Sequence, residues 1–180
     1  DLDGGASCGK DTVVKNAYIT IDPNLPCIVT MPANGSATTQ TACTGTIFDS
    51  GGPNGDYGAN ENSVITISPI GAADVTLNFI SFDIEAGQNN SCNFDDLKVY
   101  DGNSTAATLI GTYCNNNIPT TITSTGGSIT IEFSSDGGVE DAGFEIDWSC
   151  NLSNVAPIAN FDVNVDSTCT GEVQFTDLST

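Results

Sequence analysis

The chain has 180 residues, 38% of them hydrophobic, which is enough for one core with a small addition on either side. Its formal net charge is −20, because 23 acidic residues face only three Lys. A surface this acidic repels phosphate, so nucleic acid is not an expected partner. Seven Cys and no His are typical of a disulfide-bonded extracellular protein and exclude histidine-dependent catalysis within the chain. No stretch is apolar enough to cross a bilayer, so we expect a secreted or cell-surface protein without membrane insertion.

The first part of the chain, residues 1–42, is expected to be a small β extension followed by a linker. Alternating hydrophobic residues predict short strands at 18–21 and 27–31, separated by a proline-rich turn, and Cys8 could pair with Cys27 to close this unit. Residues 33–41 are rich in Gly, Ser, Thr and Ala, as flexible linkers are.

From residue 44 onward, hydrophobic and polar residues alternate as they do in half-buried strands. The inward-facing sets are Ile65 and Ile67; Val75, Leu77 and Phe79; Leu97 and Val99; Ile129, Ile131 and Phe133; Phe144, Ile146 and Trp148. The inward set changes from odd to even positions between Phe79 and Phe82, which predicts a β-bulge near residues 80–81. Turns rich in Gly, Asn and Asp separate these segments. The pattern predicts an all-β protein, an antiparallel two-sheet β-sandwich.

Three acidic residues stand at the ends of these segments. Glu85 ends one segment, Asp95 begins the next, and Asp136 follows a third. Hard cations such as calcium prefer oxygen ligands, which carboxylates supply without histidine. The same spacing is also compatible with a solvated acidic surface, because the chain has 23 acidic residues to distribute.

The order of motifs from Cys43 to Cys150 resembles that of a CUB domain. These motifs are TGTIFDSGGPNGDYGANEN, FDIE, CNFDDLKVYDG, IGTYC, IEFSSD and GFEIDW. The resemblance implies a CUB-like jelly roll at residues 43–150.

The resemblance also implies roles for individual residues. Glu85, Asp95 and Asp136 match the positions of the Ca²⁺ ligands in calcium-binding CUB domains, and it is this match that favours calcium over a bare acidic surface. Tyr57 matches a tyrosine that hydrogen-bonds to the cluster. The loop between Glu85 and Asp95 is longer than is common in the family, which leaves its path open.

The cysteines fit the same family. Cys92 and Cys114 have the spacing of its second disulfide. Cys43 and Cys150 stand at the two ends of the domain, and their pairing would join its first and last strands. That pairing departs from many animal CUB domains and is similar to the arrangement in bacterial secreted proteins.

Residues 151–180 resemble the start of a PKD domain, an immunoglobulin-like β-sandwich. The matching positions are Pro157, Ala159, Phe161, Val173, Phe175, Asp177, Ser179 and Thr180. Only the first strands of such a domain are present, so we expect a longer parent protein in which Cys169 pairs with a residue after Thr180. The alternative is a strand pair that docks on the CUB domain.

A CUB domain followed by a PKD domain is found in secreted and cell-surface proteins of Bacteroidetes. Two triplets, at Thr12 and Ser167, resemble the sites at which these bacteria attach O-glycans. The resulting hypothesis is a non-catalytic, calcium-stabilised binding or spacer module of an adhesin-like protein, with type IX secretion as a possible route. The alternatives are an accessory region of a secreted hydrolase such as a metalloprotease, and a structural building block of an extracellular filament.

A ligand of the module is expected at the loops around the calcium site, near Tyr57 and in residues 86–93 and 136–141. An ion that fixes these Gly- and Asn-rich loops would lower the entropy lost on binding. The ligand would be a protein or a glycan, and the resemblance implies a basic side chain on a protein partner. The competing interpretation is that the ion serves stability alone and recognition lies elsewhere.

Overall fold

The computed structural model describes residues 27–153, 161–163 and 175–177. Its strands and short 3-10 helices are, in chain order, β1 (Cys27–Thr30), β2 (Asn34–Ser36), β3 (Thr44–Phe48), η1 (Gly52–Asn54), β4 (Asn62–Ile67), β5 (Ala72–Asp83), η2 (Gln88–Asn90), β6 (Asp96–Asp101), β7 (Thr108–Tyr113), β8 (Ile122–Thr123), β9 (Ile129–Ser134), β10 (Gly143–Leu152), β11 (Phe161–Val163) and β12 (Phe175–Asp177). Within these ranges no helix has the length and apolar character that crossing a membrane requires.

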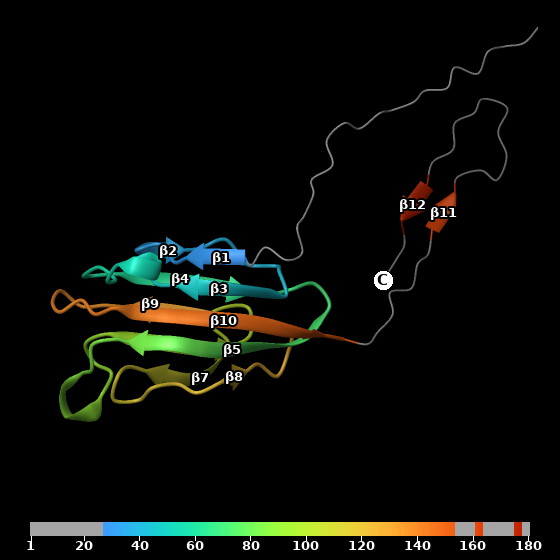
Figure 1. Cartoon of the computed structure of the whole chain (residues 1–180). Coiled ribbons are helices and arrows are strands. Elements are labelled where there is room, and N and C mark those ends of the chain that lie inside the picture. Colours follow the sequence, from blue (N-terminus) through green and yellow to red (C-terminus); the bar gives the residue numbers. More distant parts are fainter. Residues whose placement is uncertain (1–26, 154–160, 164–174, 178–180) are drawn as a thin grey trace, which may run out of the picture.

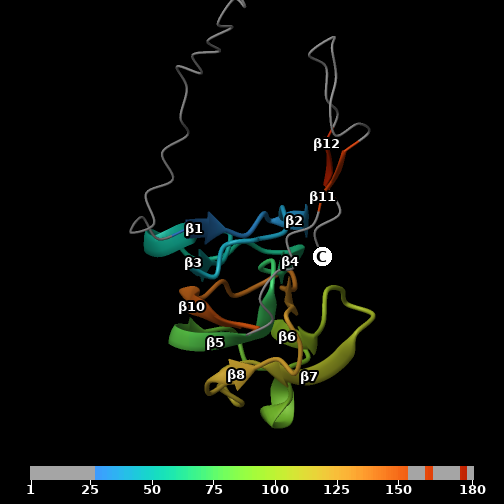
Figure 2. The same cartoon turned by 90° about the vertical axis from the view of Figure 1, so that its right-hand side faces the viewer.

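Ten of the described strands form two five-stranded sheets packed face to face (Figures 1 and 2). The strand order is β1-β3-β10-β5-β8 in the first sheet, here called sheet A, and β2-β4-β9-β6-β7 in the second, sheet B. The all-β sandwich predicted from the alternating pattern is therefore confirmed.

The sheets are mixed rather than purely antiparallel, which corrects one detail of the prediction. β1 pairs in parallel with β3, and β2 pairs in parallel with β4, whereas the pairs among the other strands are antiparallel. Both parallel strands are short and lie at sheet edges, where each replaces solvent as the hydrogen-bond partner of a longer strand.

Residues 33–41 are not a linker, contrary to the sequence-based expectation. Asn34–Ser36 is the edge strand of sheet B, and Gln40 forms an isolated parallel bridge with Ile67. Met31, just before this segment, is only 2% exposed and belongs to the core. The described part of the sandwich thus starts at Cys27, before the expected boundary at residue 43, and the strand expected at residues 18–21 lies outside the described residues.

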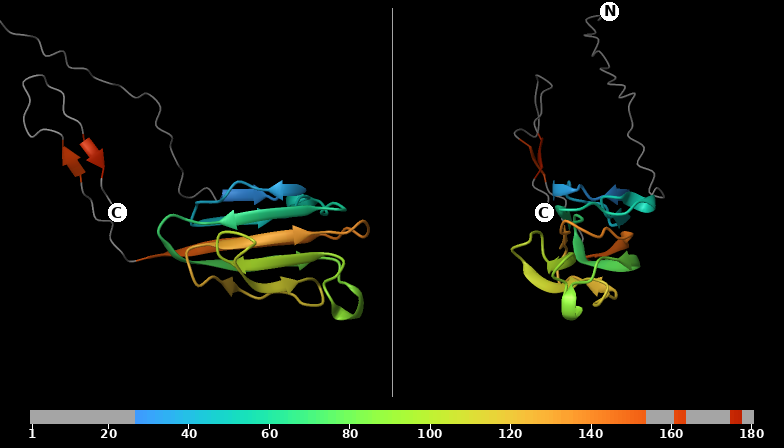
Figure 3. Two further views of the ribbon diagram at one scale, coloured as in Figure 1. Left: turned by 180° about the vertical axis from the view of Figure 1, so that it is seen from behind. Right: turned by 90° about the vertical axis from the view of Figure 1, so that its left-hand side faces the viewer.

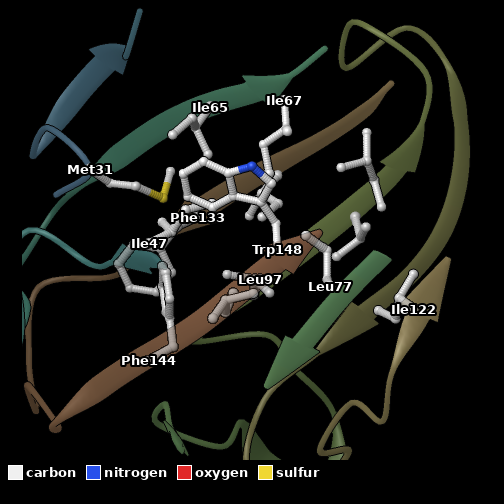
Figure 4. Packing of buried hydrophobic residues seen from close by; sticks show 14 of the residues in the cluster. Met31, Ile47, Ile65, Ile67, Leu77, Leu97, Ile122, Phe133, Phe144 and Trp148 are labelled. Carbon is white, nitrogen blue, oxygen red and sulfur yellow. The ribbon is translucent and has the colours of Figure 1, made fainter. Parts of the chain in front are cut away.

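The core between the sheets contains the inward-facing sets that the alternation predicted, together with residues outside those sets such as Met31, Ile47 and Ile122 (Figure 4). The expected β-bulge is confirmed as well. Phe79 lies opposite Ile146 and Ser81 opposite Glu145, which leaves Ile80 without an opposite residue. The bulge lets both Phe79 and Phe82 pack against the core from one continuous strand.

Trp148 is a 2% exposed member of this core, and its ring packs against a glycine of the neighbouring strand. Its indole N–H donates to the Ala42 carbonyl oxygen at 3.0 Å, and its strand partner in β3 is Gly45. A Cβ at Gly45 would lie 2.1 Å from the Trp148 ring and 2.4 Å from the Cys27 carbonyl oxygen. The indole therefore fills the space that any larger residue would need.

Gly45→Ala should lower the free energy of unfolding by about 1–3 kcal/mol, because the added methyl group overpacks the core. Urea denaturation followed by tryptophan fluorescence measures the change. Gly126→Ala is the matched control, since a Cβ there has no neighbour within 4 Å. Equal stability of the two variants would contradict the packing described for Trp148.

Two disulfides join segments that are distant in sequence, and both were expected: Cys92–Cys114 from the CUB resemblance and Cys43–Cys150 from its place at the two ends of the domain. Cys43 pairs with Cys150, with 5.0 Å between the Cα atoms, and links the start of β3 to β10. Cys92 pairs with Cys114 at 5.5 Å and ties the loop before β6 to the end of β7. The proposed partner of Cys27, Cys8, lies outside the described residues, as does Cys169.

The described part of the tail is a pair of short strands. β11 and β12 are antiparallel, with Phe161 opposite Asp177 and Val163 opposite Phe175. Strands were expected at these positions from the resemblance to a PKD domain. Thr12 and Ser167 lie outside the described residues.

Candidate metal centre

Three loops meet at one end of the sandwich, opposite the end from which β10 leaves (Figures 1 and 3). They are the β3–β4 loop, which contains η1, the β5–β6 loop, which contains η2, and the β9–β10 loop. Each of them carries residues that the sequence analysis selected.

The predicted ligand residues come together at this end. Glu85, Asp95 and Asp136 each present one carboxylate oxygen, and these oxygens all lie within 4.8 Å of one another. Asp95 is 1% exposed, Glu85 is half-buried and Asp136 is exposed. The group therefore has a buried base and an open side through which an ion or a partner can approach.

Tyr57 connects two members of the group to the core. Its hydroxyl donates to Asp95 Oδ2 at 2.6 Å and accepts the Glu85 backbone N–H at 3.1 Å. The ring is 1% exposed and packs edge-to-face on Phe133, with 5.0 Å between centroids. Because the core fixes the ring, the hydroxyl holds Asp95 and the start of the β5–β6 loop in place. This matches the role that the CUB resemblance implied for Tyr57.

Asp95 also holds Asp136, the third residue of the group. Its Oδ1 accepts the Asp136 backbone N–H at 2.7 Å, so its two oxygens bind groups from two different loops. The Asp136 side chain accepts the Gly138 N–H at 2.9 Å, which forms a tight local turn. These contacts position the group through hydrogen bonds of the protein itself.

The electrostatics of the group favour a cation. Burial raises the pKa of Asp95, and the charges of Asp136 and Asp96 raise it further, whereas the hydrogen bonds from Tyr57 and Asp136 lower it. Partial burial, followed by the charges of Asp95 and Asp136, raises the pKa of Glu85. Burial, and then the bond to Asp95, raises the pKa of Tyr57, which therefore remains a donor.

No basic side chain of the protein compensates these acids in the described residues. Lys98 is the only Lys or Arg between residues 27 and 153, and it pairs with Asp96 at 2.8 Å. The acidic field extends beyond the group, since burial, Asp83, Asp95 and Asp56 together raise the pKa of Asp141. An oxygen-only group with this charge fits a hard divalent cation such as calcium, which takes six to eight oxygen ligands.

The β5–β6 loop, whose path the sequence left open, is held by local bonds. Ser91 Oγ donates to the Gln88 carbonyl at 2.6 Å, and the Cys92–Cys114 disulfide anchors the loop to β7. Asn89 adopts φ 56° inside η2, a left-handed conformation that Asn tolerates. These bonds and η2 thus shape the loop between Glu85 and Asp95.

Two buried acids next to the site were missed by the sequence analysis. Asp49 is 1% exposed and accepts the backbone N–H groups of Gly51 and Phe144, both at 2.8 Å. Glu61 is 6% exposed and lies at the end of the same loop. The sequence does contain a signal for Asp49, because an Asp followed by Ser-Gly-Gly is typical of a turn closed by its side chain. No local signal distinguishes Glu61.

A two-layer β-sandwich with an acidic, oxygen-only site between its end loops defines a recognisable class of extracellular module. The family model of the CUB domain matches residues 36–148. The chain therefore belongs to the CUB domain family, whose members are non-catalytic binding modules of larger proteins.

Solved structures support this assignment. The second CUB domain of MASP-1, whose structure contains bound Ca²⁺, is 30% identical, with a TM-score of 0.56 over 64% of this chain and 99% of that domain. The CUB1-EGF-CUB2 region of human MASP-1/3 is 26% identical with the same TM-score, over 64% of this chain and 42% of that one.

Sequence relatives are much longer than this chain. Cubilin of Homo sapiens is 37% identical over 98 residues, which are 53% of this chain and 3% of cubilin. Exoskeleton protein RP43 of Riftia pachyptila is 28% identical over 158 residues, 81% of this chain and 37% of that protein. The chain thus spans 3% of the length of cubilin and 37% of the length of the exoskeleton protein.

Proposed function

We propose that this chain is a calcium-stabilised extracellular binding module of a larger secreted or cell-surface protein. The observation that carries the proposal is the group Glu85, Asp95 and Asp136, whose oxygens lie within 4.8 Å of one another without a basic side chain among them. Calcium bound there would neutralise charges that otherwise repel one another, and Tyr57 would keep the ligands oriented. The Ca²⁺-bound MASP-1 domain supports the same assignment.

Calcium should raise the melting temperature of the chelator-treated protein, and magnesium at equal concentration should raise it less. Extracellular modules bind calcium with Kd of about 0.1–1 mM, so millimolar calcium should add about 0.4–1.4 kcal/mol to the free energy of unfolding. Differential scanning calorimetry in EGTA, calcium chloride and magnesium chloride measures this. An identical melting temperature in all three would refute the proposal.

The calcium-dependent gain should increase with pH. The pKa values of Glu85 and Asp95 are raised in the folded protein. In calcium-free protein, the stability that these two groups contribute is therefore fully present below the ordinary carboxyl pKa of about 4. It is lost as the pH rises through the raised pKa values. Calcium binds the deprotonated forms and reverses that loss. The difference in melting temperature between calcium and magnesium, measured from roughly pH 4 to 7, should therefore widen; a constant difference would contradict this account.

We place the ligand-binding surface on the loops that the ion would fix, around Tyr57 and in residues 86–93 and 136–141. The net charge of −20 would steer a basic protein partner toward this end, and a calcium-coordinated glycan is the other ligand class. Binding to protein and glycan arrays should require calcium and be lost in Asp136→Ala. Calcium-independent binding by folded Asp136→Ala would place recognition on another surface.

The proposal also covers the domain that follows the CUB domain in the chain. We propose that the CUB domain ends near Cys150 and that residues 151–180 are a linker and the start of a PKD-like domain, in an adhesin-like protein of the kind exported by Bacteroidetes. The strand pair β11–β12 is compatible with the first strands of such a domain.

A second candidate function is a building block of an extracellular material. It is favoured by the match of 81% of the chain to a protein named for the exoskeleton of Riftia pachyptila. Sedimentation velocity with and without calcium distinguishes the two, because a building block would self-associate whereas a binding module would remain monomeric.

A further inference from the structure

Glu61 is a buried acid outside the group of predicted ligands. It is 6% exposed, and its Oε1 accepts the Ser50 hydroxyl at 2.6 Å and the Gly58 N–H at 2.9 Å. Its second oxygen, Oε2, is buried without a hydrogen-bond partner. Gly58 must be glycine for this contact, since a Cβ there would lie 2.5 Å from Oε1.

Stability alone is a poor explanation for this residue. A buried carboxylate with one oxygen unpaired loses solvation that its two hydrogen bonds replace only in part. A well-packed apolar residue of similar volume would avoid this cost. The contacts of Glu61 therefore need a reason beyond the stability of the loop in which it lies.

Glu61 lies between the two loop segments that support the metal centre. On one side, its carboxylate holds Gly58, the residue after Tyr57. On the other side, its backbone N–H donates to Ser135 Oγ at 3.0 Å, and its carbonyl accepts the Ser135 N–H at 3.0 Å. Ser135 is the residue before Asp136.

Two further bonds close this network. Ser135 Oγ donates to the Gly58 carbonyl at 2.7 Å, and the Asn60 N–H donates to the Asp136 carbonyl at 2.6 Å. The β3–β4 loop, which presents Tyr57, is thus bonded directly to the segment that presents Asp136. A change in the conformation of residues 58–61 would shift both at once.

We infer that Glu61 is a positioning residue of the calcium site. Its carboxylate fixes residues 58–61 in the conformation that presents the Tyr57 hydroxyl to Asp95 and holds Asp136 beside it. The inference rests on the proposed function, because it assigns a role toward the same ion. Groups that orient metal ligands in this way typically change metal affinity 10- to 100-fold when removed.

Calcium titration calorimetry on wild-type protein, Glu61→Ala and Glu61→Gln tests the inference. Glu61→Ala should raise the calcium Kd by about 10- to 100-fold. Glu61→Gln keeps an oxygen that accepts from Ser50 and Gly58, so it should restore most of the affinity. Glu132→Ala is the matched control, since it also removes one negative charge and one bond to a hydroxyl, that of Tyr100, and it should leave the Kd unchanged.

The outcomes separate this inference from the proposed function. If wild-type protein binds no calcium, the proposed function is overturned. If wild-type protein and Glu61→Ala bind calcium equally tightly at a temperature where both are folded, the inference is overturned. A purely structural role would lower the melting temperature in calcium-free buffer but leave the Kd of the folded protein unchanged.

Ser135→Ala keeps the inference testable if Glu61→Ala does not fold. It removes the hydroxyl that joins Glu61 to Gly58 and leaves the buried carboxylate in place. We expect the calcium Kd to rise in this variant too, and an unchanged Kd in the folded variant would overturn the inference.

Discussion

Asp95→Asn should abolish calcium binding at millimolar calcium, with a rise in Kd of about 100-fold or more. Asp95 is the buried residue of the proposed site, and both of its oxygens accept hydrogen bonds, from the Tyr57 hydroxyl and the Asp136 N–H. An asparagine would remove one charge and turn an NH₂ group toward one of these donors. The unpaired donor should also lower the free energy of unfolding by about 1–3 kcal/mol in calcium-free buffer.

Asp96→Asn is the matched control for this change. Asp96 is the next residue, and its carboxylate pairs with Lys98 instead of joining the group. Calcium titration calorimetry of both variants should show binding only in Asp96→Asn. Calcium affinity in Asp95→Asn equal to that of wild-type protein would exclude Asp95 as a ligand.

Removal of the Cys43–Cys150 disulfide should cause the largest loss of stability. The crosslink closes a loop with a sequence separation of 107, compared with 22 for Cys92–Cys114. In the chain-entropy model these crosslinks stabilise the fold by about 4.7 and about 3 kcal/mol, because a longer loop restricts the unfolded chain more.

Urea denaturation of Cys43→Ala/Cys150→Ala and of Cys92→Ala/Cys114→Ala compares the two contributions. The first double variant should unfold at the lower urea concentration and should still bind calcium where it is folded. The second should be more stable but should bind calcium less tightly, because Cys92 anchors the loop between Glu85 and Asp95. The reverse order of stability would contradict the chain-entropy argument.

The central strands could be predicted because each carries a complete local signal. Strand β9 alternates the buried hydrophobic residues Ile129, Ile131 and Phe133 with polar residues, and the change of register in β5 indicated the bulge at Ile80. The candidate ligands could be identified only with the help of the CUB resemblance. Strand ends bring Glu85, Asp95 and Asp136 together. The spacing of these acids in the sequence is nevertheless compatible with both a metal site and a solvated acidic surface.

The edge strand β2 and the long-range contacts of the buried acids could not be predicted from local patterns. The three residues of β2 are all exposed, so their polar sequence is that of a linker, and only pairing with β4 makes them a strand. Burial of Asp49 depends on the N–H of Phe144, which is 95 residues away in sequence. The backbone N–H of the buried Glu61 donates to Ser135 Oγ, 74 residues away. Such contacts between residues distant in sequence form only in the folded chain, so the residues next to each acid do not indicate its partner.

A crystal structure of the protein grown with calcium chloride tests the central claim most directly. We predict one calcium ion coordinated by Glu85, Asp95 and Asp136, with calcium–oxygen distances of about 2.3–2.6 Å. The Tyr57 hydroxyl should remain bonded to Asp95 in that structure. Saturated crystals with no ion between these carboxylates, or with calcium bound only by other residues, would contradict the account.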